Sequence, residues 1–215
     1  MQKIALIDYG SGNLPSAEKA LIAAAARLDR SLDIRATDDP DFVSRADSIV
    51  LPGVGAFRAC MQALSARDGL IQALNEAVRG RGAAFLGICV GMQLLAERGL
   101  EFGETRGLGW IEGEVRRLTP VDPHLAKVPH MGWNDIVPAG DHPLSRAFAP
   151  GTDMYFTHSY AFYPKEAADI AATVDHGGVF CAMVARDNIA GVQFHPEKSQ
   201  SAGLHLIERF LEWRP

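Results

Sequence analysis

The stretch GAAFLGICVGMQLL, residues 82–95, contains an apolar run that ends at a cysteine, with a glycine two residues before it and another two residues after it. Residues 83–88 are expected to form a buried strand and residues 90–97 a helix, which places Cys89 at the turn between them. The G-x-nucleophile-x-G spacing is typical of a strand–turn–helix elbow that presents its central side chain. Free cysteine is also among the residue types most often buried, so this stretch alone leaves open whether Cys89 is a core thiol or a nucleophile.

Apolar segments and helical segments alternate through the first half of the chain, which predicts a parallel sheet covered on both faces. The second half is richer in short strands, which indicates antiparallel additions. The expected strands are 3–8, 33–37, 48–53, 83–88, 113–118, 133–137, 153–160, 169–175, 179–185 and 190–195. The expected helices are 15–28, 57–79 in one or two pieces, 90–97 and an amphipathic helix at 202–213. We expect one α/β domain over residues 1–215.

The net charge, the cysteine spacing and the length of the apolar runs argue against several classes of protein. The 215 residues carry a net charge of −5 without a basic block, which gives no support for binding to nucleic acid or to an anionic membrane. The three cysteines, Cys60, Cys89 and Cys181, are widely spaced and form no CxxC, which argues against a disulfide framework or a zinc cluster. The longest nearly apolar run, 83–96, is too short for a membrane span. A cytoplasmic protein is expected.

Two further loops follow expected strands, at the sheet edge where parallel sheets bind ligands. LPGVGAF, residues 51–57, has glycines that let the backbone approach a ligand and turn its N–H groups inward. Gly53, Val54 and Gly55 are therefore candidates for an oxyanion hole, together with the N–H of Val90 directly after the cysteine. An ordinary strand-to-helix turn is the alternative. YGSGN, residues 9–13, lacks the spacing of a phosphate loop and is expected to be a tight turn.

A cysteine nucleophile needs a base, and the base needs a group that orients it. In GVQFHPE, residues 191–197, His195 ends a strand and Glu197 follows two positions later, on the same side of an extended backbone. The alternative is a strand-end histidine beside an exposed glutamate. Three other histidines, His124, His142 and His176, lie beside turn residues and are expected to be solvated, whereas His130 and His158 remain possible bases. The His-x-Glu pair has no evident third ligand, so no metal site is predicted.

GICVGMQLL, LPGVGAF and GVQFHPEKS resemble the three signatures of the class I glutamine amidotransferases, and the order of the cysteine and the later His-x-Glu pair, with their wide separation, also matches that family. The resemblance implies a flavodoxin-like fold and hydrolysis of L-glutamine by a triad of Cys89, His195 and Glu197, with no cofactor and no metal. It also implies that glutamine is bound by Gln93 and by the backbone around His158, Ser159 and Tyr160.

IDYGSGNL, VPHMGWN and MYFTHSY are similar to one branch of this family, the glutaminase subunits of histidine biosynthesis that pass ammonia through a (β/α)8 cyclase subunit. A heterodimer is therefore expected, with Met131, Trp133 and Lys198 at the interface; a buried core position is the alternative for Trp133. Three other functions remain open: a stand-alone cysteine hydrolase of γ-glutamyl substrates, a glutaminase for another ammonia acceptor, and a non-catalytic binding subunit in which Cys89 belongs to the core.

Overall fold

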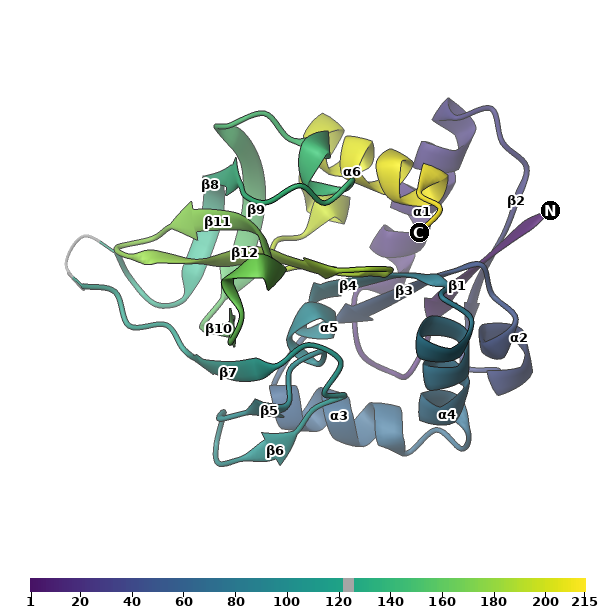
Figure 1. Cartoon of the computed structure of the whole chain (residues 1–215), viewed down its shortest axis with the longest axis horizontal. Coiled ribbons are helices and arrows are strands. Elements are labelled where there is room, and N and C mark those ends of the chain that lie inside the picture. The colour runs from purple at the N-terminus through teal and green to yellow at the C-terminus, as the bar shows by residue number, and fades with distance from the viewer. Residues whose placement is uncertain (122–125) are drawn as a thin grey trace.

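The structure, a computed structural model, describes residues 1–121 and 126–215. Its main sheet has nine strands in the order β2-β1-β3-β4-β13-β12-β11-β8-β9 (Figure 1). These strands are β1 (Gln2–Ile7), β2 (Leu32–Thr37), β3 (Ser48–Gly53), β4 (Ala84–Cys89), β8 (His130–Pro138), β9 (Thr152–His158), β11 (Ile170–Asp175), β12 (Val179–Arg186) and β13 (Ile189–Val192).

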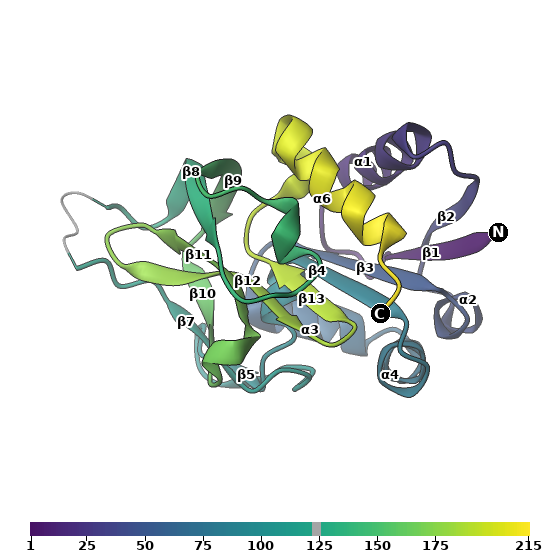
Figure 2. The ribbon, with the colours of Figure 1, turned by 45° about the horizontal axis from the view of Figure 1, so that its top comes forward.

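The first half of the main sheet is parallel, as the alternation of segments predicts. Neighbouring strands from β2 to β13 run in the same direction, and their order is that of flavodoxin-like folds. Strands β3 and β4 are buried along their whole length, because helices cover both faces. One face carries α1 (Leu14–Arg27) and α6 (Gln200–Glu212), which lie side by side (Figure 2). The other face carries α2 (Pro40–Ser44), α3 (Phe57–Ser65), α4 (Leu70–Asn75) and α5 (Val90–Gln93).

One expected helical segment is confirmed in two pieces, and another is shorter than expected. The expected helix 57–79 consists of α3 and α4, which are separated at Gly69 with φ at 73°, followed by a π-helical turn at Glu76–Gly80. The expected helix 90–97 is wrong beyond Gln93, where α5 ends. The carbonyls of residues 94–96 accept hydrogen bonds from the N–H groups of residues 108–111, so the chain turns away from the helix axis.

The second half of the main sheet is antiparallel, as expected, and extends it from β13 through β12, β11 and β8 to β9. The single strand expected at 153–160 is wrong, because the chain leaves the main sheet at Ser159. It continues as β10 (Tyr160–Pro164), which pairs with β7 (Gly113–Arg117) in a second sheet of order β10-β7-β5-β6. The two-residue strands β5 (Arg98–Gly99) and β6 (Thr105–Arg106) are too short to give a period in the sequence.

Within the described ranges, no helix is both long enough and apolar enough to cross a lipid bilayer.

Candidate active site

Cys89 lies at a sharp turn between β4 and α5. Its backbone has φ at 55° and ψ at −111°, a conformation that costs a non-glycine residue about 1–3 kcal/mol and persists only where the surroundings impose it. Gly91 allows the close packing that imposes this turn, because a Cβ there would collide with the Leu51 carbonyl of β3. The G-x-C-x-G segment therefore has the geometry of a nucleophile elbow.

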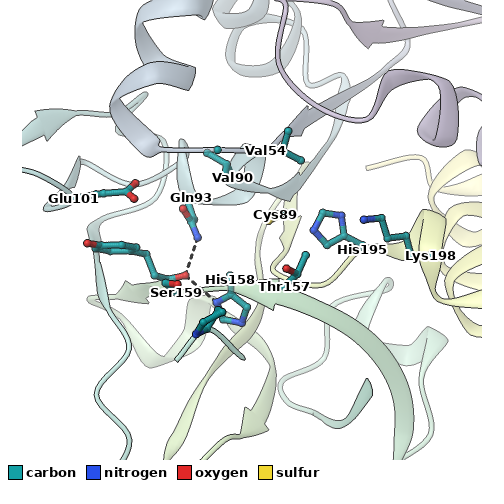
Figure 3. A pocket seen from close by; sticks show the side chains of 13 residues that line it. Val54, Cys89, Val90, Gln93, Glu101, Thr157, His158, Ser159, His195 and Lys198 are labelled. Carbon is teal, nitrogen blue, oxygen red and sulfur yellow. Dashed lines mark hydrogen bonds between the residues drawn. The ribbon is translucent and has the colours of Figure 1, made fainter. Parts of the chain in front are cut away.

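Strand register brings the other candidate residues to Cys89. Strand β4 lies between β3 and β13, with Gly53 beside Cys89 on one side and Val192 beside Ile88 on the other. Both neighbouring strands run parallel to β4, so the loop after β3 and the segment that leads to His195 reach the same edge of the sheet. Figure 3 shows His195 beside Cys89 in the pocket at this edge.

His195 Nδ1 lies 2.8 Å from Glu197 Oε1, and only 2% and 4% of the two side chains are exposed. The expected route to this contact, an extended backbone, is wrong, because Pro196–Lys198 forms a 3-10 turn. Ser199 stabilises the turn: its hydroxyl donates to the His195 carbonyl and accepts from the Tyr155 N–H, at 2.6 and 3.0 Å. The buried carboxylate therefore holds the imidazole with Nδ1 protonated.

Burial lowers the pKa of His195, but its interactions with the neighbouring Cys89 and with the hydrogen-bonded carboxylate of Glu197 outweigh this and raise the pKa overall. His195 Nε2 is buried and makes no hydrogen bond to any residue of the described structure. Gln193 Nε2 donates to Cys89 Sγ at 3.6 Å. Taken together, these groups favour an imidazolium beside the sulfur atom, and that imidazolium can deliver a proton to a leaving group.

The pocket at Cys89 has a volume of about 340 Å³, which suits a small ligand. Ten of its lining residues are those proposed from the sequence: Val54, Gly55, Cys89, Val90, Gln93, His158, Ser159, Tyr160, His195 and Lys198. Gly53 is buried below the loop and does not line this pocket. Glu101, Pro129 and Thr157 also line it. No spacing in the sequence pointed to these three.

The loop after β3 is held by Ser11 and Cys60. The Val54 N–H donates to Ser11 Oγ at 3.4 Å, and the Val54 carbonyl accepts from Ser11 Oγ and Cys60 Sγ at 2.8 and 3.4 Å. The N–H of Val54 is therefore directed to Ser11 in this structure. Val90 is the first residue of α5, so its N–H has no acceptor within the helix. Val90 and Gly55 both line the pocket and remain the candidates for donors to an oxyanion.

Gln93 and Glu101 give the pocket acceptors. Gln93 Nε2 donates to the Tyr160 carbonyl and to Gln193 Oε1, at 2.9 and 3.0 Å. Both amide hydrogens are thus used, which leaves Gln93 Oε1 to accept from a ligand. Glu101 Oε2 accepts from the Phe57 N–H at 2.8 Å. Figure 3 shows Glu101 on the opposite side of the pocket from His195 and Lys198.

Among the described residues, no other histidine makes a hydrogen bond to Cys89, whose side-chain partner is Gln193. His130 and His158 are buried and joined through Nδ1 and Nε2 at 3.1 Å, and burial lowers their pKa to about 3 and about 4. The expectation that His142 and His176 are solvated is wrong. Both are half-buried and interact with main-chain carbonyls, at Asp187 and Lys127. His124 lies outside the described residues.

The three residues expected at an interface lie on one exposed surface. Met131 and Trp133 point outward from β8 and are 64% and 48% exposed, which excludes a core position for Trp133. The rings of Trp133 and Tyr155 are 5.9 Å apart, and Lys198 Nζ lies 5.7 Å from the Tyr155 ring. Thr157, which pairs with Met131 across the strands, lines the pocket. This surface therefore reaches the mouth of the pocket.

In residues 1–121 and 126–215, no group of three or more His, Cys, Asp or Glu side chains has a geometry that could hold a metal ion.

Comparison with known proteins assigns the family. The model of the family "Glutamine amidotransferase class-I" matches residues 5–213. The chain is 58% identical to "Imidazole glycerol phosphate synthase subunit HisH" of Caulobacter vibrioides, over 100% of both chains. It is 54% identical to the protein of the same description from Zymomonas mobilis, over 99% of this chain and 96% of the relative.

Solved structures agree on the fold. A structure described as "Crystal structure of glutamine amidotransferase" superposes with a TM-score of 0.70 at 17% identity, over 97% of both chains. The glutaminase domain of Trypanosoma brucei CTPS with bound acivicin superposes with a TM-score of 0.66 at 18% identity, over 100% of this chain and 96% of the other. With its sequence matched almost from end to end and its fold shared, this chain belongs to the class I glutamine amidotransferase family.

Proposed function

We propose that this chain is the glutaminase subunit of an imidazole glycerol phosphate synthase, which acts in histidine biosynthesis. It hydrolyses L-glutamine to glutamate and ammonia, and it passes the ammonia to a (β/α)8 cyclase subunit. The observation that carries the proposal is the convergence of Cys89 and His195 on one pocket at the edge of the parallel sheet, with Glu197 hydrogen-bonded to His195 behind it. The relatives named above, which match this chain over nearly their whole length, support the assignment.

The reaction is an acyl transfer in two halves. The Cys89 thiolate attacks the side-chain carbonyl carbon of glutamine, and the backbone N–H groups of Val90 and Gly55 stabilise the negative oxygen. The imidazolium of His195 protonates the amide nitrogen, the C–N bond breaks, and ammonia leaves a thioester on Cys89. Neutral His195 then takes a proton from water, which attacks the thioester and releases glutamate. Glu197 keeps the ring oriented throughout.

Substrate binding follows from the charges around the pocket. Glutamine carries an ammonium and a carboxylate on its α-carbon, at the end opposite the reacting amide. Glu101 lies across the pocket from His195 and is suited to the ammonium, with Gln93 Oε1 as a second acceptor. The backbone at residues 158–160 offers further polar groups for the α-carboxylate.

A partner subunit explains the exposed surface beside the pocket. Ammonia that escapes into water at neutral pH is protonated and can no longer act as a nucleophile. The surface formed by Met131, Trp133, Tyr155 and Lys198 places an aromatic anchor and a cation next to the pocket mouth, which is ordinary interface chemistry. A cyclase docked there would cover the exit from Cys89. We also propose a cytoplasmic location, since the three cysteines are free.

Reconstitution with the cyclase subunit tests this function. Glutamine hydrolysis should increase strongly when the cyclase is added, and the complex should make imidazole glycerol phosphate from glutamine. High glutaminase turnover that the cyclase leaves unchanged would instead indicate a stand-alone hydrolase. Complex formation without glutamine hydrolysis would indicate a non-catalytic binding subunit.

A further inference from the structure

A chain of hydrogen bonds connects the inward face of β8 with the glutamine pocket. Asn134 Nδ2 lies 3.2 Å from His130 Nε2, and His130 Nδ1 lies 3.1 Å from His158 Nε2. His158 Nδ1 lies 2.9 Å from the Tyr160 carbonyl oxygen, which also accepts from Gln93 Nε2 at 2.9 Å. The two bonds to this carbonyl are drawn in Figure 3. None of these contacts involves the catalytic triad.

The chain has a single donor direction. A carbonyl oxygen can only accept, so His158 carries its proton on Nδ1 and presents a lone pair on Nε2. His130 must then donate from Nδ1, which leaves its Nε2 to accept from Asn134. The amide of Asn134 is oriented independently, because its Nδ2 also donates to the Asp175 carbonyl at 2.8 Å. Every bond therefore points from Asn134 towards Tyr160.

Both rings must be neutral for this direction to hold. An imidazolium at His158 would place its Nε2–H against the Nδ1–H of His130. The surroundings disfavour charge: the His130 ring is stacked against Phe156 and His176, with ring centroids 4.5 and 4.1 Å away, and Phe180 meets it edge-on. Burial comes first among the causes that lower the pKa of both rings.

This hydrogen-bond chain affects the orientation of the Gln93 side-chain amide. His158 and Gln93 occupy both lone pairs of the Tyr160 carbonyl. A reversed Gln93 amide would place its oxygen against the oxygens of Tyr160 and Gln193, so the observed orientation is the one that these partners allow. We infer that Asn134 and His130 are positioning residues, which act through His158 and the Tyr160 carbonyl to keep the oxygen of Gln93 available to the nitrogen donors of glutamine. This inference rests on the proposed function.

The test compares His130→Phe with His130→Asn in the complex with the cyclase subunit. Phenylalanine keeps the ring volume but cannot donate, whereas asparagine loses the ring but keeps a nitrogen donor close to the position of Nδ1. We expect His130→Phe to raise the KM for glutamine about tenfold or more with a much smaller change in kcat, because a buried acceptor on His158 is left unpaired. His130→Asn should stay within about threefold of the wild-type KM. If His130 acted only through the packing of its ring, His130→Asn would raise the KM for glutamine more than His130→Phe. That order, or equal KM values in the two variants, would overturn the inference.

A second readout, which holds even where His130→Phe does not fold, is the protonation of the rings. We expect ¹⁵N NMR of the wild-type chain to show His130 and His158 protonated on Nδ1 alone at neutral pH. In Asn134→Asp a carboxylate oxygen, which can only accept, lies against His130 Nε2. We therefore expect His130 Nε2 to become protonated in this variant and the KM for glutamine to rise. Gln72→Glu, the same chemical change on an exposed residue of α4, should do neither.

Either of two results refutes the inference: a wild-type His158 protonated on Nε2, or an Asn134→Asp variant with wild-type KM. Absence of glutamine hydrolysis by the wild-type complex would refute the proposed function instead, since the NMR spectrum reports on the hydrogen-bond chain alone.

Discussion

Glu197 Oε1 accepts a hydrogen bond from His195 Nδ1 over 2.8 Å, while the opposite ring nitrogen of His195 is buried without a hydrogen-bond partner among the described residues. One side of the imidazole is thus held by a buried carboxylate, and the other side is left for Cys89 and the atoms of a reacting substrate. This asymmetry is what a general acid and base requires, because the ring must not rotate while its free nitrogen exchanges a proton.

Cys89 should be the single thiol labelled by a glutamine analogue that alkylates cysteines. It lines the pocket, whereas Cys60 and Cys181 are buried outside it, and burial raises the pKa of both. Intact-protein mass spectrometry with peptide mapping should therefore find one label, on Cys89. A label on either of the other cysteines would contradict this assignment.

Cys89→Ala should separate the two activities of the complex. Glutamine-dependent synthesis should fall by roughly 10⁴-fold or more, because the nucleophile is lost. Synthesis from added ammonium salt should stay close to wild type, since the cyclase supplies that chemistry. Initial rates with each nitrogen source measure the difference. Loss of both activities together would contradict the proposed division of labour.

Glu197→Gln should lower kcat by roughly 10²–10⁴-fold, because an amide can hold the ring but cannot stabilise its positive charge. The variant should also change the pH profile. Glu197 is one of the groups that raise the pKa of His195, so its neutralisation lowers this pKa, and the imidazolium is lost at a lower pH. The alkaline limb of kcat/KM should therefore move to lower pH. Glu76→Gln, an exposed control, should leave the profile unchanged. A Glu197→Gln profile that superposes on the wild type would refute this role.

Glu101→Gln should raise the KM for glutamine by about tenfold to hundredfold, because the pocket loses the carboxylate that faces the substrate ammonium. The fold should be retained, because the amide oxygen of the new side chain at position 101 can still accept the hydrogen bond from the Phe57 N–H. The matched control is Glu104→Gln, in the same loop, where the carboxylate is exposed and paired with Arg98. Steady-state kinetics of the complex measure both variants. Equal KM values for the two would show that Glu101 does not bind the substrate.

Trp133→Ala should weaken binding to the cyclase subunit by roughly 30-fold, the loss of about 2 kcal/mol that is typical of an aromatic anchor. Ile22→Ala is the control: it also removes an exposed apolar side chain, on α1, away from the β8–β9 surface. Titration calorimetry with the purified cyclase measures both affinities. Equal losses, or none for Trp133→Ala, would place the interface elsewhere.

Local patterns in the sequence predict much of this molecule. The apolar runs that become β1, β3 and β4 can be recognised because fully buried strands need no polar face. The elbow is local as well, since two glycines and the intervening residues define it. The expected helix beyond Gln93 was wrong for a reason no local pattern contains: the carbonyls of residues 94–96 accept from N–H groups of residues 108–111. Likewise, the expected strand at 153–160 divides between two sheets because β10 pairs with β7.

The sequence by itself determined which residues can carry the chemistry: a cysteine between two glycines, a histidine with a glutamate two positions later, and a glycine-rich loop. Only the tertiary structure decided that they meet. The parallel register of β3, β4 and β13 brings segments more than a hundred residues apart along the chain, such as Gln193 and Cys89, to one edge of the sheet. The tertiary structure also places Glu101 in the pocket and aligns Asn134, His130 and His158 into one donor direction, because hydrogen-bond partners are determined by position in space and not by spacing along the chain.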